Sequence, residues 1–212
     1  MTFQLVEPIL LIGLGGVGAR LAEKAKKSLN SDCLLISHDQ KDLTIENSIK
    51  ISTKSVVNPS THLIRGSTLE TSDEIKKNIA NYSTVILMSN LAGKAGTGIG
   101  PIVSRICKQE QKNLLSFVVM PFKFEKERIF QSGIALKRIR QDSQCTIVVD
   151  NDALLDSNPD LTQNQCYDIS NKAIESMMHS LKSSEISGDT NILSTGKAAS
   201  DIEVSLKDSL RM

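Results

Sequence analysis

A chain of 212 residues is long enough for one well-buried core, and its 40% hydrophobic and 23% charged residues are typical of a globular protein. Lys and Arg number 25 against 24 Asp and Glu, so the formal net charge is +1, which argues against nucleic acid as a partner. No apolar run approaches the roughly 20 residues that span a bilayer, and no signal peptide is recognisable, so we expect no membrane span and a cytoplasmic location.

Short apolar runs alternate with helical patterns along the chain. We expect strands at residues 9–13 (ILLIG), 33–37 (CLLIS), 84–88 (TVILM), 114–120 (LLSFVVM) and 145–149 (CTIVV). We expect helices at residues 19–29, 72–81, 101–111, 126–140 and 161–181, the second with Ser72 as its N-cap. Residues 40–70 are polar and weakly periodic, which predicts short irregular pieces. The alternation predicts an α/β fold, a Rossmann-like parallel sheet with helices on both faces.

The first glycine-rich loop, residues 13–18 (GLGGVG), follows the first strand and opens a helix. Gly15 and Gly16 would let backbone N–H groups approach a phosphate, and the helix N-terminus adds partial positive charge. Asp39 ends the second strand, where an acid holds the ribose in dinucleotide-binding folds. This loop therefore fits NAD, ATP or GTP, and it also resembles the loop of ThiF-type adenylating enzymes.

A second glycine-rich loop, residues 92–101 (AGKAGTGIGP), follows the third strand. Both loops leave strand carboxyl ends, so we expect them at the same edge of the sheet, where such sheets bind ligands. Bare amides and the Thr97 hydroxyl could surround a phosphate here, whereas we expect Lys94 to point into solvent. An NAD-binding fold needs no second loop of this kind.

Several ordered segments resemble FtsZ and the tubulins. KAGTGIG resembles the tubulin signature GGGTG[S/T]G through Gly96, Thr97, Gly98 and Gly100. Further resemblances lie at residues 36–43 (ISHDQKDL), 121–125 (PFKFE), 133–136 (GIAL) and 147–155 (IVVDNDALL). The set spans roughly residues 8–181, so the chain resembles the GTPase domain of the FtsZ/tubulin superfamily.

The resemblance implies a site for GTP or GDP, with Mg²⁺ held through the phosphates. Gly15, Gly16, Gly18 and Arg20 would lie on one side of the phosphates, and Gly96, Thr97, Gly98 and Gly100 on the other. Asp39 would lie near the phosphates through Mg²⁺ and water. Glu125 would contact the ribose, and Arg128 matches the family's Arg at an altered spacing.

The base would be bound by three further residues. Asn151 matches the Asn that binds guanine in the family. Tyr167 and Asn171 are four residues apart, on one helix face, and resemble the pair in which Tyr stacks on the base and Asn reads its edge. An amide both donates and accepts hydrogen bonds, as the guanine edge requires.

The resemblance also divides the chain. Residues 1–182 would form the nucleotide-binding domain with its long C-terminal helix, and residues 183–212 a short helix or partly flexible segment, with the family's second domain absent. In residues 187–196 (SGDTNILSTG), Leu193 and Gly196 occupy the positions of the acids that activate water in the family. A neutral loop cannot orient or deprotonate water, so we expect weak or absent hydrolysis and assign no catalytic residue.

The function favoured by the sequence is a guanine-nucleotide-binding, FtsZ-like protein that associates with itself or with an FtsZ homologue, or that modulates a cytoskeletal or cell-division filament. One alternative is a Rossmann-type enzyme that uses NAD or ATP, which would explain residues 13–18 and Asp39 but not the later segments. Another is a nucleotide-free scaffold relative, motivated by the departures from the family pattern at Arg20, Lys94 and Ile99. The cysteines and histidines have no ligand spacing, so we expect free thiols and no metal site of protein groups alone.

Overall fold

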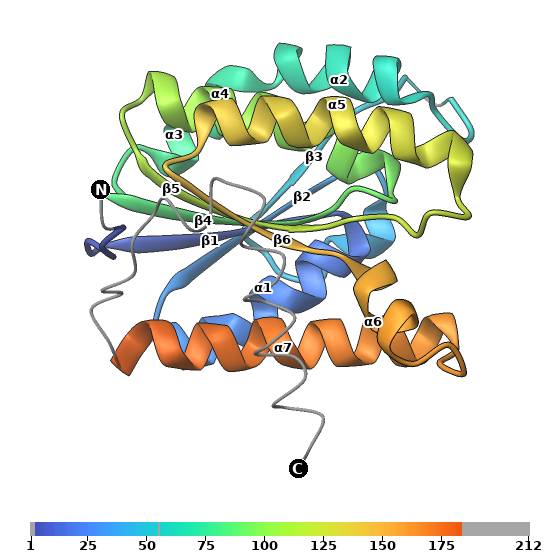
Figure 1. Cartoon of the computed structure of the whole chain (residues 1–212). Helices are drawn as coiled ribbons and strands as arrows, with labels where there is room; N and C mark the ends of the chain where they lie inside the picture. Colours follow the sequence, from blue (N-terminus) through green and yellow to red (C-terminus); the bar gives the residue numbers. More distant parts are fainter. Residues whose placement is uncertain (1–2, 55, 184–212) are drawn as a thin grey trace.

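The computed structural model describes residues 3–54 and 56–183, and within them a six-stranded sheet forms the centre of the molecule (Figure 1). All strand pairs are parallel, in the order β3-β2-β1-β4-β5-β6. The strands are β1 (Ile9–Leu14), β2 (Asp32–Ser37), β3 (Ser48–Lys50), β4 (Thr84–Asn90), β5 (Asn113–Val119) and β6 (Cys145–Val149). The prediction of a parallel α/β sheet is confirmed, with β3 as an edge strand that the sequence did not indicate.

Helices cover both faces of this sheet, as expected. The helices are α1 (Gly15–Leu29), α2 (Thr61–Glu70), α3 (Ser72–Ile79), α4 (Lys94–Gln109), α5 (Lys126–Asp142), α6 (Asn151–Ser157) and α7 (Gln163–Ser183), with a 3₁₀ turn, η1, at Gln40–Asp42. Figure 1 shows α2, α3, α4 and α5 above the sheet and α1, α6 and α7 below it. The long C-terminal helix is present as α7, and residues from 184 onward lie outside the described part.

Each face of the sheet has its own hydrophobic core. On one face, side chains of β1 such as Leu11 pack with α1 and with Ile174 and Met178 of α7. On the other, Leu10 and Ile12 pack with α2, α3 and α4. Strands that are buried on both faces read as continuous apolar runs, which is why the sequence located them within two residues.

Two helices begin earlier than the sequence predicted, because their first turns contain the glycines. Helix α1 begins at Gly15 and α4 at Lys94, so Pro101 is inside α4 rather than at its start. Proline has no N–H to donate to the carbonyl four residues earlier. That carbonyl, on Thr97, instead accepts a hydrogen bond of 3.3 Å from Nη2 of Arg65 on α2. The expected N-cap is also wrong, since Ser72 is the first residue of α3 and Thr71 precedes it.

Helix α2 lies in the stretch that the sequence predicted to be irregular. Ser60 caps its N-terminus, with Oγ accepting a hydrogen bond from the Leu63 N–H at 3.2 Å. The buried face of the helix carries Ile64, Ser67 and Thr68. Because two of these three side chains are small and polar, no apolar periodicity marks the helix in the sequence.

The strand order places a topological switch point between β1 and β4, which are neighbours at the centre of the sheet. The chain leaves β1 through α1 below the sheet toward β2, and leaves β4 through α4 above the sheet toward β5 (Figure 1). A crevice outside the carboxyl ends of two such strands is where open α/β sheets bind ligands. Among the described residues, no helix combines the length and hydropathy needed to cross a membrane.

Candidate functional site

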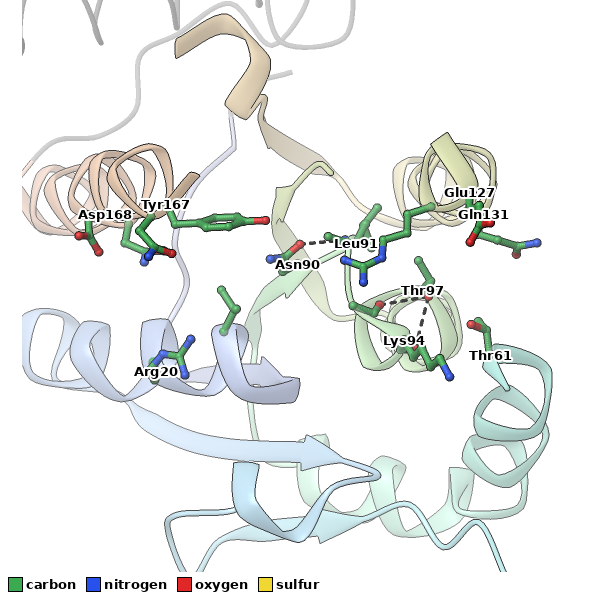
Figure 2. Close-up of a pocket in the computed structure, with 16 residues that line it drawn as sticks. Arg20, Thr61, Asn90, Leu91, Lys94, Thr97, Glu127, Gln131, Tyr167 and Asp168 are labelled. Carbon is green, nitrogen blue, oxygen red and sulfur yellow. Dashed lines mark hydrogen bonds between the residues drawn. The ribbon is translucent and has the colours of Figure 1, made fainter. Parts of the chain in front are cut away.

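A cavity of about 1010 Å³ opens at this switch point, between α1, α4, α5 and α7 and the first residue of α2 (Figure 2). Its volume is at the upper end of the roughly 300–1,000 Å³ that small-molecule sites occupy. The predicted site residues that line it are Arg20, Thr97, Arg128, Tyr167 and Asn171. The fold therefore brings together residues from four helices that lie far apart in the sequence.

The two helices that flank the switch point begin without side-chain caps. Leu14 precedes α1 and Gly93 precedes α4, and neither accepts a hydrogen bond through a side chain. Neither helix carries an acidic residue in its first turn. The N–H groups of a helix's first turn have no partner within the helix, and the helix dipole adds partial positive charge there. These two termini are therefore suited to binding an anion.

The two helix N-termini are also close to each other. Gly15, the first residue of α1, has φ +63°, a left-handed conformation that glycine adopts without steric cost. A Cβ on Gly15 would lie only 2.8 Å from Cβ of Ala95, the second residue of α4. One phosphate group or a pair of them could thus contact both helices.

Cationic side chains outnumber acidic ones on the cavity wall. The cations are Arg20, Lys94 and Arg128, against the acids Glu127 and Asp168. Lys94 is exposed, as expected, but its ammonium group also has partners in the protein. Its Nζ donates to Oδ1 of Asn58 at 2.6 Å and to the carbonyl of Pro59 at 3.0 Å, which ties the start of α4 to the segment before α2.

Four glycines assigned to phosphate binding lie in close contact with other parts of the protein. A Cβ on Gly18 would lie 2.3 Å from the carbonyl oxygen of Met88, and one on Gly96 would lie 2.1 Å from that of Asn90. A Cβ on Gly98 would lie 2.8 Å from Cγ2 of Ile64, and one on Gly100 would lie 3.1 Å from Cδ1 of Ile139. The glycines therefore let α1 and α4 approach β4, and let α2 and α5 approach α4. None of the four lines the cavity.

Tyr167 and Asn171 lie on the face of α7 that borders the cavity. Figure 2 shows the Tyr167 ring extending from α7 into the cavity. The ring packs edge-on against Phe122, with centroids 5.4 Å apart. Burial raises the pKa of the Tyr167 hydroxyl, and the nearby Glu125 carboxylate raises it further. Asn164 and Asp168 line the same wall, a role that the three- and four-residue spacing along the helix could have indicated.

Glu125 supports the cavity wall without lining it. Its Oε1 accepts a hydrogen bond from Nη1 of Arg128 at 2.6 Å, and its Oε2 accepts one from the N–H of Phe122 at 3.1 Å. The carboxylate thus orients Arg128, which does line the cavity, and fixes the loop that carries Phe122 against Tyr167. In this arrangement both carboxylate oxygens are already hydrogen-bonded.

Asn151 is fully buried and does not line the cavity. Its Nδ2 donates to the carbonyl of Met120 at 3.3 Å, and its Oδ1 accepts from Oγ of Ser170 at 2.6 Å. Ser170 is on α7 directly before Asn171, so the amide anchors the helix that carries the aromatic ring. Both ends of the Asn151 amide are thus hydrogen-bonded within the protein.

The acid that lies against the first turn of α1 is Asp42 rather than Asp39. Asp39 is exposed, and its Oδ1 accepts a hydrogen bond from the Lys41 N–H at 3.0 Å, which caps η1. Asp42 accepts a hydrogen bond from Oγ of Ser37 at 2.6 Å, and its Oδ1 lies 2.7 Å from where a Cβ on Gly16 would be. Among the described residues, no cluster of three or more His, Cys, Asp or Glu could hold a metal ion.

The arrangement fits a nucleotide. Free amides and cations lie where phosphates would bind, and an aromatic ring lies across the cavity from them. A family model described as Tubulin/FtsZ family, GTPase domain, matches residues 8–159. This stretch contains every lining residue except those of α7.

Known proteins resemble the chain over most of its length. Cell division protein FtsZ 2 of Halobacterium salinarum is 26% identical over 180 residues, which cover 78% of this chain and 44% of the relative. FtsZ 1 of the same organism is 26% identical over 191 residues, which cover 84% of this chain and 47% of the relative. The chain thus spans less than half the length of these relatives.

Solved structures share the fold. An empty FtsZ dimer from M. jannaschii matches with a TM-score of 0.73 at 22% identity, over 82% of this chain and 54% of that one. CetZ from Methanosaeta thermophila matches with a TM-score of 0.67 at 16% identity, over 94% of this chain and 58% of that one.

Proposed function

The chain belongs to the Tubulin/FtsZ family through its GTPase domain, and on this premise we propose that it binds a guanine nucleotide, GTP or GDP, in the switch-point cavity. The observation that carries the proposal is the pair of helix N-termini at the cavity. Helices α1 and α4 begin side by side with no side-chain cap and no acid in the first turn. Such termini bind phosphate through backbone amides and partial positive charge.

The proposed pose places the phosphates between these two termini, with Arg20 and Arg128 on the flanking walls. The base lies on the Tyr167 ring, against which Phe122 packs edge-on. Asn171, one helical turn further along α7, reads the guanine edge through its amide. Mg²⁺, when present, is held through the phosphates.

Two residues that the family resemblance assigned to direct contacts act through others in this proposal. Glu125 positions Arg128 and Phe122, since each of its oxygens accepts a hydrogen bond from one of them. Asn151 positions α7 through Ser170. Both are positioning residues in this chain, whereas Arg128 and Tyr167 contact the nucleotide.

The alternative of an NAD-using enzyme gains no support from the site. It relied on Asp39 to hold a ribose, and that carboxylate caps η1 and is not part of the cavity wall. The preference for guanine relies instead on Tyr167 and Asn171 of α7, which line the cavity.

Weak or absent GTP hydrolysis is part of the proposal. It rests on the sequence at residues 187–196, where Leu193 and Gly196 stand in place of acids, and these positions lie outside the described residues. We further propose that the protein associates with itself or with an FtsZ homologue. Phosphate release at high protein concentration tests the first clause, and sedimentation with and without GTP tests the second.

Calorimetric titration of the purified protein with GDP, GTP, ATP and NAD tests the binding proposal. We expect a single site for GDP and GTP, and much weaker binding of ATP and NAD. Tyr167→Ala should weaken GDP binding about tenfold or more, since aromatic stacking on a base contributes about 1–3 kcal/mol. Tyr82→Ala is the matched control, because Tyr82 precedes β4 at the opposite edge of the sheet. Binding of NAD or ATP in preference to GDP would overturn the proposal.

A further inference from the structure

Helix α5 has an outer face that no other part of the described protein covers. The helix packs mainly on α4, with further contacts to β5 and β6, and Figure 1 shows it on the outside of the layer above the sheet. Its buried face carries Ser132, Ala135 and Ile139. Positions spaced alternately four and three residues apart lie together on one side of a helix. On the side opposite the buried face, five such positions are all exposed, and we call them the α5 stripe: Lys126, Phe130, Gly133, Lys137 and Arg140.

An exposed aromatic ring lies in the N-terminal half of the α5 stripe. Phe130 is 70% exposed, and its neighbour Ile129 is 37% exposed. Three of the chain's five phenylalanines are buried in the core, so such exposure is not general in this protein. Neither side chain has a hydrogen-bonding atom, and apolar surface is more stable out of water. Together they offer an apolar anchor to a partner outside the chain.

Positive charge dominates α5 and is not neutralised along the stripe. The helix carries five Lys and Arg against two Asp and Glu, in a chain whose net charge is only +1. Both acids are engaged elsewhere, since Glu127 lines the cavity and Asp142 forms an ion pair of 3.2 Å with Lys108. Within residues 3–54 and 56–183, no carboxylate forms an ion pair with the three cations of the stripe. An anionic partner would therefore be attracted here.

The positive region continues from the stripe toward α2. Arg138 follows Lys137, and its charge acts on Arg65 of α2. Burial lowers the pKa of the Arg65 guanidinium, and the positive charge of Arg138 lowers it further. Neither arginine has a carboxylate as an ion-pair partner in the part of the chain that the structure describes. Because the two like charges disfavour each other, a nearby anion would stabilise both.

A hollow of about 340 Å³ lies along the C-terminal half of the stripe, lined by Gly133, Leu136, Lys137, Arg140 and Gln141. A Cβ on Gly133 would meet no atom within 4 Å, so no contact within the protein requires a glycine there. Glycine is unfavourable in the interior of a helix. The missing side chain leaves room for an external group beside two cations and the apolar Leu136, which suits a group that is anionic at one end and apolar at the other.

We propose that the α5 stripe binds the surface of an anionic lipid bilayer, with α5 lying parallel to it. Lys126, Lys137 and Arg140 contact lipid phosphates, and Phe130 enters the boundary between headgroups and acyl chains. The stripe is about 21 Å long, from 14 residues at a rise of about 1.5 Å each. A bilayer presents phosphates above an apolar layer over a flat area of this length. A nucleic acid would supply phosphates but no apolar layer for Phe130 and Ile129. The inference does not require a nucleotide in the cavity.

Co-sedimentation with vesicles tests the proposal, using the nucleotide-free protein and phosphatidylcholine vesicles with and without phosphatidylserine. We expect binding to the vesicles that contain phosphatidylserine, weakened by added salt, and little binding to phosphatidylcholine alone. The double variant Lys137→Gln, Arg140→Gln should lower the affinity about tenfold to thirtyfold, because each cation near an anionic surface adds to binding. Phe130→Ser should lower it about tenfold through loss of the apolar anchor.

Two matched controls remove the same kinds of group elsewhere. Lys26→Gln with Lys27→Gln removes two exposed cations from α1, below the sheet, and Val57→Ser removes an apolar side chain that is 93% exposed. Each control should change the affinity less than about twofold. All the substituted side chains are exposed, so each variant should melt close to the wild-type temperature, which separates lost binding from lost folding.

Three results would overturn the inference. The first is no binding to vesicles with phosphatidylserine, or equal binding to both kinds of vesicle. The second is a loss of affinity in the control variants as large as that in the α5 variants. The third is binding of RNA or poly-glutamate, but not of vesicles, that depends on Lys137 and Arg140, which would assign the stripe to a different class of partner.

Discussion

Replacement of Gly96 by alanine should destabilise the protein in the absence of any nucleotide. The new Cβ would lie 2.1 Å from the carbonyl oxygen of Asn90 and 2.8 Å from its carbonyl carbon. Contacts shorter than 3.0 Å are essentially never made by real Cβ atoms, so α4 must move away from β4 by about 0.9 Å (3.0 − 2.1). The obstacle is backbone, which cannot rotate aside as a side chain can.

The expected cost follows from two opposing terms. Overpacking a core costs about 1–3 kcal/mol, and we take about 3 because the backbone of a central strand resists displacement. Alanine in a helix is about 1 kcal/mol more favourable than glycine. The net loss is about 2 kcal/mol, which lowers the melting temperature by about 4–8 °C for a chain of this size.

Thermal unfolding followed by circular dichroism, without nucleotide, measures this loss. The matched control is Gly133→Ala in α5, where a Cβ would have no atom within 4 Å. It should raise the free energy of unfolding by about 0.5–1 kcal/mol. If Gly96→Ala melted at or above the wild-type temperature, the packing role of this glycine would be refuted, and its presence would have to be explained by a ligand.

Three further predictions concern buried groups. All four cysteines are buried, and burial raises the pKa of Cys33 to about 11 and that of Cys107 to about 12. The native protein should therefore react negligibly with a thiol reagent at neutral pH and show four reactive thiols after denaturation. Rapid labelling of the native protein would contradict this. Burial lowers the pKa of His38 below its ordinary value of 6.5, so the unfolded state takes up the proton first, and stability should be lost as the pH falls through about 6.5 toward the folded-state pKa. His38→Gln should reduce this loss in melting curves between about pH 7.5 and 5.5, and an unchanged pH profile would rule out His38 as its cause. Asn151→Ala should cost about 1–3 kcal/mol in urea denaturation because it leaves the Met120 carbonyl and the Ser170 hydroxyl without their partner. Asn78→Ala, at a partly exposed position of α3, should cost much less, and equal costs would refute the anchoring role.

The sequence predicted the sheet well because buried parallel strands leave an unmistakable pattern. Runs such as ILLIG and TVILM are almost entirely apolar, since both faces of each strand are covered. The sequence did not predict helix α2, because that helix packs on α4 through Ile64 against Gly98, and Ser67 and Thr68 complete its buried face. Complementarity between two helices is not visible in either one alone.

The residues of the site were also predicted only in part, because their positions depend on tertiary contacts. Arg20, Arg128, Tyr167 and Asn171 reach the cavity as the sequence indicated. A motif gives residue types in order but not the direction in which a side chain points. The Asn151 amide turns inward to Met120 and Ser170, for example.

Glycines posed a related difficulty. A glycine that faces a phosphate and one that lets a helix approach a strand look identical in a sequence. Gly18 and Gly96 let a helix approach β4, and only the positions of Met88 and Asn90 reveal this role. The partners of Lys94 were equally invisible in the sequence, since its Nζ donates hydrogen bonds to Asn58 and Pro59, which no motif connects with it.

A crystal structure of the purified protein grown with GDP tests the central claim most directly. We predict density for one nucleotide in the switch-point cavity, with its phosphates within about 2.7–3.2 Å of backbone N–H groups in the first turns of α1 and α4, and with guanine stacked on Tyr167. A nucleotide bound elsewhere, or a base that lies away from α7 with the cavity filled by solvent, would contradict the account.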